Sequence, residues 1–277
     1  GAPVGVILAN IAFISVSLIT SEENFLAWGW RIPFLISFVL VIISMYIQLR
    51  LEDTKAFKEL EAAKTSQDNT KQEIKSSPIL EALRRYPRRI SLAAGAFLSI
   101  QVTFYILVAF ILAYGVATTD LSRNDLLAAV LIGSAIMVPL QFYFSHYSDN
   151  NGRKGIFMAG ALMTALWSFF LFPLIDTGNF YLVILAVTGG LAFLGMMYGP
   201  QAAFFAELFS TEVRYSGASL GYQIGAILGG SFAPTIATLL WTSYDIFWVS
   251  VYIALASAAS LLSVYFLTET YKTDLNK

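Results

Sequence analysis

Long runs of apolar residues without Asp, Glu, Lys or Arg alternate with short charged segments along this chain. A helix needs ~20 residues at about 1.5 Å each to cross the hydrocarbon core of a bilayer, and most of the runs reach that length. The run at 32–49 is shorter, but Trp28, Trp30 and Arg50 can extend it at the membrane interfaces. The pattern therefore predicts eight membrane-spanning helices. Their charge-free runs are residues 1–21, 32–49, 90–119, 126–148, 155–175, 177–206, 215–244 and 246–268.

The same runs argue against the other folds that bury much apolar surface. Transmembrane β-strands would alternate polar and apolar residues over ~10 positions, which these runs do not do. Buried helices of a soluble protein would need a polar face at helical spacing. Composition agrees, because hydrophobic residues make up 57% of the chain and charged residues 13%, against ~25% in soluble domains. We therefore expect an all-α membrane protein.

The basic residues predict the orientation of the helices, since cytoplasmic loops are enriched in Lys and Arg. Fifteen of the 17 basic residues fall on the side of the loop at 51–89 and the C-terminal tail. Only Arg31 and Arg123 fall on the other side. We therefore expect both ends of the chain to be cytoplasmic.

A long charged segment divides the predicted spans into two before it and six after it. This loop reads best as a solvated linker, because charge runs usually are solvated. The alternative is that the segment after Pro78 forms an interfacial helix whose arginines meet an anionic inner leaflet. We expect four regions: a helix pair at 1–50, a cytoplasmic central loop at 51–90, a six-helix bundle at 91–268 and a cytoplasmic tail at 269–277.

Several classes of chemistry lack the residues they need. The net charge of −1 gives no reason to expect a nucleic-acid partner. The chain has no cysteine and one histidine, His146, so it cannot build a thiolate or His-rich metal site. No acidic, basic or histidine side chain lies near the middle of a predicted span, where proton relays and intramembrane active sites place them. We expect no metal, no cofactor and no enzymatic activity.

Uncharged polar and aromatic side chains do lie inside the predicted spans. They can hydrogen-bond a polar solute while their rings exclude water. Gln101 and Tyr105, four residues apart, share a helix face, as do Tyr198 and Gln201 at three. The alternative is that such groups link helices to one another, which is common in membranes. The candidate substrate-binding residues are Gln101, Tyr105, Gln141, Tyr198, Gln201, Tyr222 and Gln223.

The seventh predicted span carries glycines at every fourth position, which form a ridge on one helix face. A ridge without side chains lets another backbone approach closely. Static packing is the favoured interpretation, and a smooth surface for sliding or rocking is the functional alternative. The residues of the ridge are Gly217, Gly221, Gly225 and Gly229.

Two charged motifs lie at the same predicted membrane edge, in the turns after the fourth and sixth spans. In the first, SDNNGRK, Gly152 permits a tight turn, and Asp149 can cap a helix start or accept from Arg153. In the second, AELFSTEVRYSG, Glu207 and Arg214 bracket the turn. We expect the four charged side chains to form one network, which could hold one conformation of the protein and break in another.

These motifs resemble two elements of the Major Facilitator Superfamily. SDNNGRK is similar to the loop signature G-x-x-[SA]-D-x-x-G-[RK]-[RK], and AELFSTEVR to E-x-x-P-T-x-x-R. Ser145 replaces the first Gly and Ser210 the Pro, which should loosen the local geometry without removing a charge. By this resemblance the cytoplasmic gate and motif residues are Asp149, Gly152, Arg153, Lys154, Glu207 and Arg214.

Longer stretches resemble the metabolite:proton symporter family, which includes shikimate, 2-oxoglutarate, citrate and proline/betaine carriers. They are WGWRIPF, LRLEDTKAF and MYGPQAAFFAELFSTEVRYSGASLGYQ. The resemblance implies that the chain corresponds to the fifth to twelfth helices of a twelve-helix transporter. It would then contain two helices of the N-terminal bundle and a complete C-terminal bundle, and the proton-coupling residue would lie in the four helices ahead of it.

The function implied by this resemblance is secondary active transport of a small polar or carboxylated metabolite by alternating access, coupled to protons. It also implies a monomeric, multi-pass protein of the inner (plasma) membrane of a bacterial cell, with lipid, metabolite and protons as its partners. The alternatives are a non-transporting membrane receptor on the same fold and an inactive truncated transporter, because fold alone does not fix function. A carboxylate would want a cationic partner, and the spans offer none at mid-depth.

Overall fold

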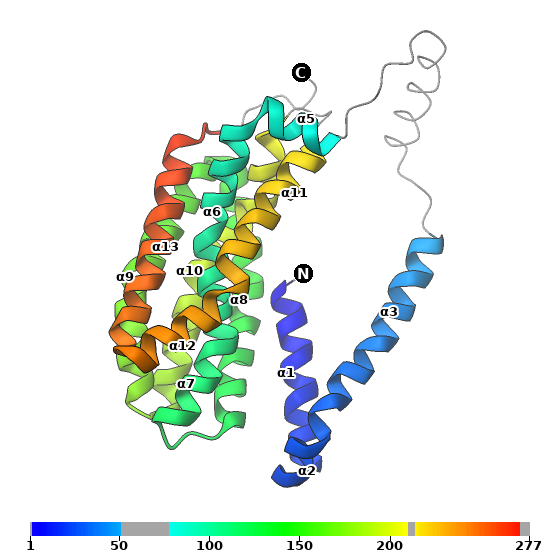
Figure 1. The fold of residues 1–277 in the computed structure, drawn as a ribbon, viewed down its shortest axis with the longest axis vertical. Helices are drawn as coiled ribbons and strands as arrows, with labels where there is room; N and C mark the ends of the chain where they lie inside the picture. Colours follow the sequence, from blue (N-terminus) through cyan, green and yellow to red (C-terminus); the bar gives the residue numbers. More distant parts are fainter. Residues whose placement is uncertain (1, 51–77, 210–213, 272–277) are drawn as a thin grey trace. The chain divides into compact units, whose positions relative to one another are not determined.

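In a computed structural model of the protein, residues 2–50, 78–209 and 214–271 are described, and they are helical except for short connections (Figure 1). Most of the expected central loop at 51–90 lies outside the described residues. The helical elements are α1 (Ala2–Ile19), α2 (Glu22–Ala27), η1 (Gly29–Arg31), α3 (Ile32–Arg50), α5 (Pro78–Arg85), α6 (Pro87–Tyr105), η2 (Ile106–Phe110), α7 (Ile111–Thr118), α8 (Arg123–Asn151), α9 (Arg153–Asp176), α10 (Phe180–Glu207), α11 (Arg214–Gly225), η3 (Ala226–Ser231), α12 (Ala233–Ser243) and α13 (Ile246–Phe266).

Seven helical segments in the described ranges are long and apolar enough to cross a membrane. α1 is also apolar but has 18 residues. Its length of ~27 Å falls just short of the ~30 Å hydrocarbon core. No strand occurs in these ranges. The all-α membrane class predicted from the charge-free runs is therefore confirmed.

The chain divides into two compact units, residues 12–77 in one and residues 1–11 with 78–277 in the other. In the smaller unit, Ser21 caps α2 by accepting from the Asn24 N–H, and Phe25 is buried. The 19 residues of α3 include none that is buried. A helix that is apolar on every side is suited to a membrane span.

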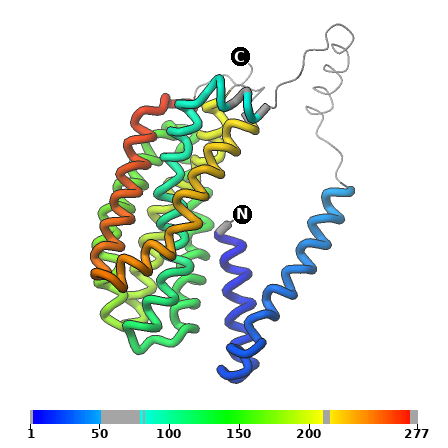
Figure 2. Tube along the Cα trace, in the orientation of Figure 1, coloured from blue at the N-terminus to red at the C-terminus, as the bar shows by residue number. Residues whose placement is uncertain are grey.

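The larger unit is a bundle of six apolar segments around one core, and Figure 2 shows them running side by side. Phe97, Phe157 and Phe204 are fully buried at its centre. α10 packs against both α8 and α9, and α13 against α9 and α6. The segments comprise residues 87–118, 123–151, 153–176, 180–207, 215–243 and 246–266.

Serine hydroxyls join α6 to α13 along one side of α6. The Ser99 N–H donates to Ser260 Oγ at 2.8 Å, and the Ser99 and Ser257 hydroxyls share a hydrogen bond of 2.8 Å. The Ser260 hydroxyl donates in turn to the Gly95 carbonyl at 2.8 Å. All three serines are buried, and the two bonds of Ser99 are fully shielded from water, whereas the bond to Gly95 is part-buried.

Glycines of α11 and η3 meet α6 on a different side. A Cβ at Gly225 would lie 2.7 Å from the Cβ of Phe97 and 2.8 Å from a backbone carbonyl of α6. Gly221 and Gly229 also face Cβ atoms of α6, at 2.8 Å and 3.0 Å. Gly217 faces an aromatic ring outside α6 instead. Three of the four predicted ridge glycines therefore lie where two helix backbones approach closely.

Candidate functional site

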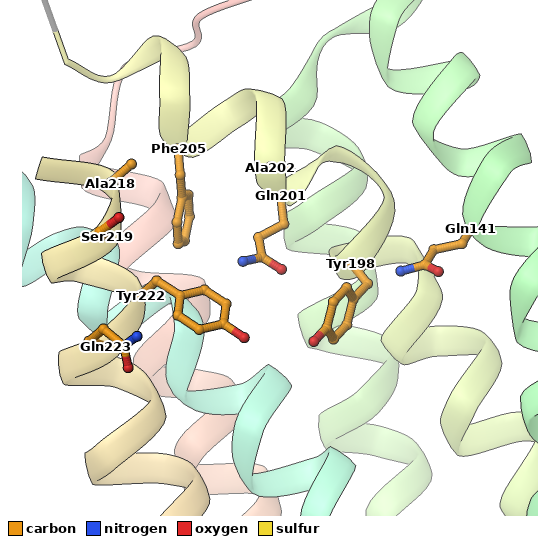
Figure 3. Close-up of a pocket in the computed structure, with 9 residues that line it drawn as sticks. All are labelled: Gln141, Tyr198, Gln201, Ala202, Phe205, Ala218, Ser219, Tyr222 and Gln223. Carbon is orange, nitrogen blue, oxygen red and sulfur yellow. The ribbon is translucent and has the colours of Figure 1, made fainter. Parts of the chain in front are cut away.

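A polar cavity of about 450 Å³ opens between α8, α10 and α11. Its volume lies within the ~300–1,000 Å³ that is usual for small-molecule sites. Amide and hydroxyl groups line it together with aromatic rings, and the described residues of its lining include no charged side chain. The lining residues are Gln141 from α8, Tyr198, Gln201, Ala202 and Phe205 from α10, and Ala218, Ser219, Tyr222 and Gln223 from α11 (Figure 3).

Gln201 is the cavity residue whose surroundings are most unusual. Its side chain is 6% exposed, and its amide has no hydrogen-bond partner within the part of the chain that the structure describes. The amide points between Tyr198 and Tyr222, whose hydroxyls are directed toward each other (Figure 3). Tyr222 is held by its ring contact with Phe97, at 4.3 Å between centroids. The amide is not among the fully covered polar atoms that lack a partner, so it opens onto the cavity, where a ligand can supply hydrogen bonds.

Gln101 and Tyr105 of α6 lie beside the polar cavity and are not part of its lining. Both approach Gly230: a Cβ there would lie 2.8 Å from the Tyr105 ring and 3.4 Å from Gln101 Nε2. Phe97, one turn before Gln101 on α6, contacts the Tyr222 ring of the cavity wall. Tyr105 immediately precedes the π-helical turn η2, and Gly230 lies in the π-helical turn η3. Such turns are frequent at functional sites.

Arg153 joins two carboxylates at the end of the bundle where α8 turns into α9, called here the charged end. Its Nε donates to both oxygens of Glu207, at 3.0 and 2.8 Å, and Nη1 donates to Asp149 Oδ1 at 2.8 Å. The side chains of Arg153 and Glu207 are 10% and 11% exposed, whereas that of Asp149 is 52% exposed. The Arg153–Glu207 pair is therefore the buried part of the arrangement, and charge-assisted bonds of this kind are strong.

Glu269 and Thr270, just beyond α13, complete this arrangement, and neither is among the residues that we selected from the sequence. The Glu269 carboxylate accepts the backbone N–H groups of Arg153 and Lys154 at 3.0 Å each, at the positive end of the α9 dipole. The Thr270 hydroxyl donates to Glu207 Oε2 at 2.5 Å. Asp149, Arg153, Glu207, Glu269 and Thr270 are called here the charged network.

Gly152 and Lys154 contribute to the charged end in other ways. Gly152 forms the turn, and Lys154 makes hydrogen bonds but no ion pair in the described ranges. Gly152 has φ of 103°, a backbone conformation that favours glycine, and a Cβ there would lie 2.9 Å from a Glu269 oxygen. Lys154 Nζ donates to the carbonyls of Tyr265 and Leu267 at 2.6 and 2.9 Å. Arg214 begins α11, but its side chain lies outside the described residues, so its expected place in the network stays a prediction.

Ser145 occupies a close crossing between α8 and α10. A Cβ at Gly199 of α10 would lie 2.9 Å from the backbone N of Ser145. The glycine that allows the two backbones to approach is therefore on α10, opposite the serine. Ser210, the other departure from the family motifs, lies outside the described residues.

Neutralising Glu269 is expected to destabilise the protein near neutral pH and to have little effect in acid. Burial opposes ionisation of this group, but four backbone N–H groups outweigh it and hold its pKa below the ordinary value of 4.5. Because the folded-state pKa is lowered, the stabilisation is complete above that ordinary value and disappears as the pH falls through the folded-state pKa. The unfolding temperature of Glu269→Gln should therefore lie below that of the parent at about pH 7 and approach it toward about pH 3.

Thermal unfolding of the purified full-length protein across that pH range measures this difference. Asp120→Asn is the matched control, because Asp120 is exposed and makes no contact within the described ranges. A gap between Glu269→Gln and the parent that stays constant with pH would contradict the interpretation.

A second polar contact, which is part-buried, joins α7 to the far end of α9. The Tyr114 hydroxyl donates to Asp176 Oδ1 at 2.6 Å, and its ring packs against those of Phe110, Phe172 and Trp241. In the residues that the structure describes, no three His, Asp or Glu side chains gather closely enough to hold a metal ion.

Comparison with known proteins gives a consistent result. Residues 4–220 match the model of the Major Facilitator Superfamily. The chain is 34% identical to the inner membrane metabolite transport protein YhjE of Escherichia coli, over 99% of this chain and 62% of the relative. It is 32% identical to the shikimate transporter of Escherichia coli, over 92% of this chain and 57% of the relative.

A more distant relative carries a different substrate in its name. The chain is 26% identical to the glycine betaine/proline/ectoine/pipecolic acid transporter OusA of Dickeya dadantii, over 99% of this chain and 55% of the relative. The chain therefore spans 55% to 62% of the length of these curated relatives.

Proposed function

Because this chain belongs to the Major Facilitator Superfamily, we propose that it forms most of a secondary active transporter that moves a small polar metabolite by alternating access. The observation that carries the proposal is the polar cavity, onto which the Gln201 amide opens without a hydrogen bond to any described residue. Transporters of this kind place their substrate between helix bundles near the middle of the bilayer. The cavity supplies neutral donors and acceptors for one side of such a site.

The lining of the cavity bears on the class of substrate. Amides and hydroxyls can bind neutral, zwitterionic or carboxylated molecules, but a carboxylate would need its charge balanced by groups outside this cavity. Shikimate, proline and glycine betaine, which name the relatives' substrates, are therefore the first probes to use. We further propose coupling to protons, which is supported by the resemblance to metabolite:proton symporters.

The charged network supports the alternating-access part of the proposal. It joins the α8–α9 turn, the end of α10 and the segment after α13 through one buried arginine. We propose that this network forms when the carrier is closed at the charged end and breaks when it opens there. The excess of basic residues on that side favours a cytoplasmic position. Membrane-impermeant labelling of cysteines introduced at Arg123 and Thr273 tests the orientation, because the chain has no cysteine of its own.

Gln201→Leu is expected to weaken substrate binding while leaving the empty protein as stable as the parent or more stable. A neutral hydrogen bond contributes ~0.5–1.5 kcal/mol, so its loss should weaken binding by roughly three- to tenfold. The Gln201 amide makes no hydrogen bond within the described residues, so the substitution removes no such bond from the empty protein. Isothermal titration with the three probes and thermal unfolding without substrate measure the two effects.

Gln48→Leu is the matched control, because it makes the same change at an exposed position of α3. A loss of stability without a change in binding would identify Gln201 as a packing residue and remove the main support for the site. Uptake into vesicles with an imposed pH gradient, with and without an uncoupler, tests the transport function. Binding without accumulation would indicate a receptor, and accumulation that an uncoupler leaves unchanged would remove the proton coupling.

A further inference from the structure

A small pocket of about 170 Å³ lies at the charged end, apart from the polar cavity. It is formed where α6 begins and where α10 and α13 end. Two arginines face a mainly apolar wall across it. The lining residues are Arg88, Arg89, Leu92, Leu208, Phe266, Leu267 and Thr268, called here the Arg88–Arg89 pocket.

The two guanidinium groups of this pocket carry charge that the described residues do not neutralise. Arg89 Nη1 donates to the Leu208 carbonyl at 2.8 Å, and the group lies 5.2 Å from the centroid of the Tyr86 ring. Neither Arg88 nor Arg89 forms an ion pair within the described ranges. Each guanidinium has five N–H donors in a planar fork, which matches the oxygens of a phosphate group. The pocket therefore offers an anion several unused donors.

The depth of the pocket places these donors among lipid headgroups. The apolar segment that begins at Pro87 has 32 residues and would be ~48 Å long. Since the hydrocarbon core is ~30 Å thick, the first turns of α6 extend into the interfacial layer. Leu92, one turn further into the span than Arg88, and the exposed ring of Phe266 line the same pocket. The arrangement therefore complements a phospholipid, because the cationic groups can face its phosphate and the apolar wall can face its acyl chain.

We propose that the Arg88–Arg89 pocket binds an anionic phospholipid, with the headgroup phosphate on the two guanidinium groups and an acyl chain along Leu92 and Phe266. A free phosphate ion would use the arginines but gain nothing from the apolar wall. Two residues of the pocket directly adjoin the charged network, since Leu208 follows Glu207 and Thr268 precedes Glu269. The bound lipid therefore braces the backbone on both sides of Arg153.

Native mass spectrometry of the full-length protein, equilibrated with phosphatidylcholine and phosphatidylglycerol, counts the retained lipids directly. The parent is expected to retain phosphatidylglycerol in preference, and Arg88→Gln combined with Arg89→Gln should lower its affinity by about tenfold or more. Arg84→Gln is the matched control, because it removes one charge from α5 at an exposed position outside the pocket. Equal losses in Arg84→Gln would reduce the effect to general surface charge and overturn the proposal.

Two further experiments distinguish lipid binding from binding of other ligands and from misfolding of the variants. Arg88→Gln alone removes no hydrogen bond found in the described ranges, so it keeps the test valid if the double variant is unstable. Inorganic phosphate should fail to displace the lipid, and Phe266→Ser should weaken retention of the lipid without changing phosphate binding. If phosphate displaces the lipid, or if Phe266→Ser retains the lipid fully, the acyl chain does not bind along Phe266. Full retention in Arg88→Gln and in the double variant would overturn the whole inference.

Discussion

Replacing Arg153 with glutamine is expected to slow transport by about a hundredfold or more while substrate affinity stays within a few fold. The substitution removes both bonds to Glu207 and leaves that carboxylate 11% exposed, with the Thr270 hydroxyl as its remaining partner. Removing one member of a buried ion pair costs ~3–5 kcal/mol, because the other charge stays buried without compensation. Since ~1.4 kcal/mol is a tenfold change in population, the closed conformation would be strongly depopulated. Initial uptake rates measured beside equilibrium substrate binding separate these effects.

A second substitution distinguishes charge balance from general damage. Arg153→Gln combined with Glu207→Gln removes both buried charges, so it should be more stable than Arg153→Gln alone. Asp149→Asn should have a smaller effect than either, because Asp149 is 52% exposed and exposed pairs contribute ~0–1 kcal/mol. If substrate binding is lost in Arg153→Gln while the exchange rate is unchanged, these residues belong to the substrate site and not to a gate.

Gly225→Leu is expected to abolish transport and to reduce sharply the yield of folded protein. Even a Cβ at this position would lie 2.7 Å from the Phe97 Cβ and 2.8 Å from a backbone carbonyl of α6. Neither atom belongs to the free end of a flexible side chain, so the two helices would have to separate. Overpacking a close-packed core costs ~1–3 kcal/mol, and a clash with backbone lies at or above the upper end of that range.

The control for this clash is available on α9. Gly155 is exposed, and a Cβ there would have no neighbour within 4 Å. Gly155→Leu should therefore retain most of the parent's folded yield and uptake. Size-exclusion profiles and unfolding temperatures of the two variants give the comparison. Similar losses in both would show that any bulky residue in these helices is harmful, and the helix contact at Gly225 would not be the cause.

The helices could be predicted from the sequence because a bilayer imposes a minimum apolar length that few other folds require. The charged residues that interrupt the runs lie in terminal turns, so the observed helices extend beyond them. α8, for example, begins at Arg123 and ends at Asn151, outside the predicted run of 126–148. Ser21 shows the opposite error, since it ends the first predicted run and caps a separate short helix. Apolar length alone carries no signal for such caps.

The site was less accessible from sequence, because its contacts join distant segments. Helical spacing could place Tyr198 and Gln201 on one face, but it could not decide that Tyr105 adjoins the cavity while Tyr222 lines it. Glu269 is 116 positions from the backbone N–H that it accepts, and one acidic residue after a helix has no periodicity. The signal that could have found it is its position, directly beyond the last apolar run on the side of the Arg153 turn.

The contacts on the two sides of α6 resist sliding of the neighbouring helices to different degrees. Sliding α6 along α13 would break three hydrogen bonds made by serines, two of them buried, each contributing ~1 kcal/mol. Sliding the described part of α11 along α6 would break no side-chain hydrogen bond at the glycine contacts, where only dispersion forces resist the displacement. Displacement along the α11–α6 contact therefore costs less free energy than displacement along the α6–α13 contact. We therefore expect a rearrangement of the bundle to move the described part of α11 past α6, while α6 and α13 stay together.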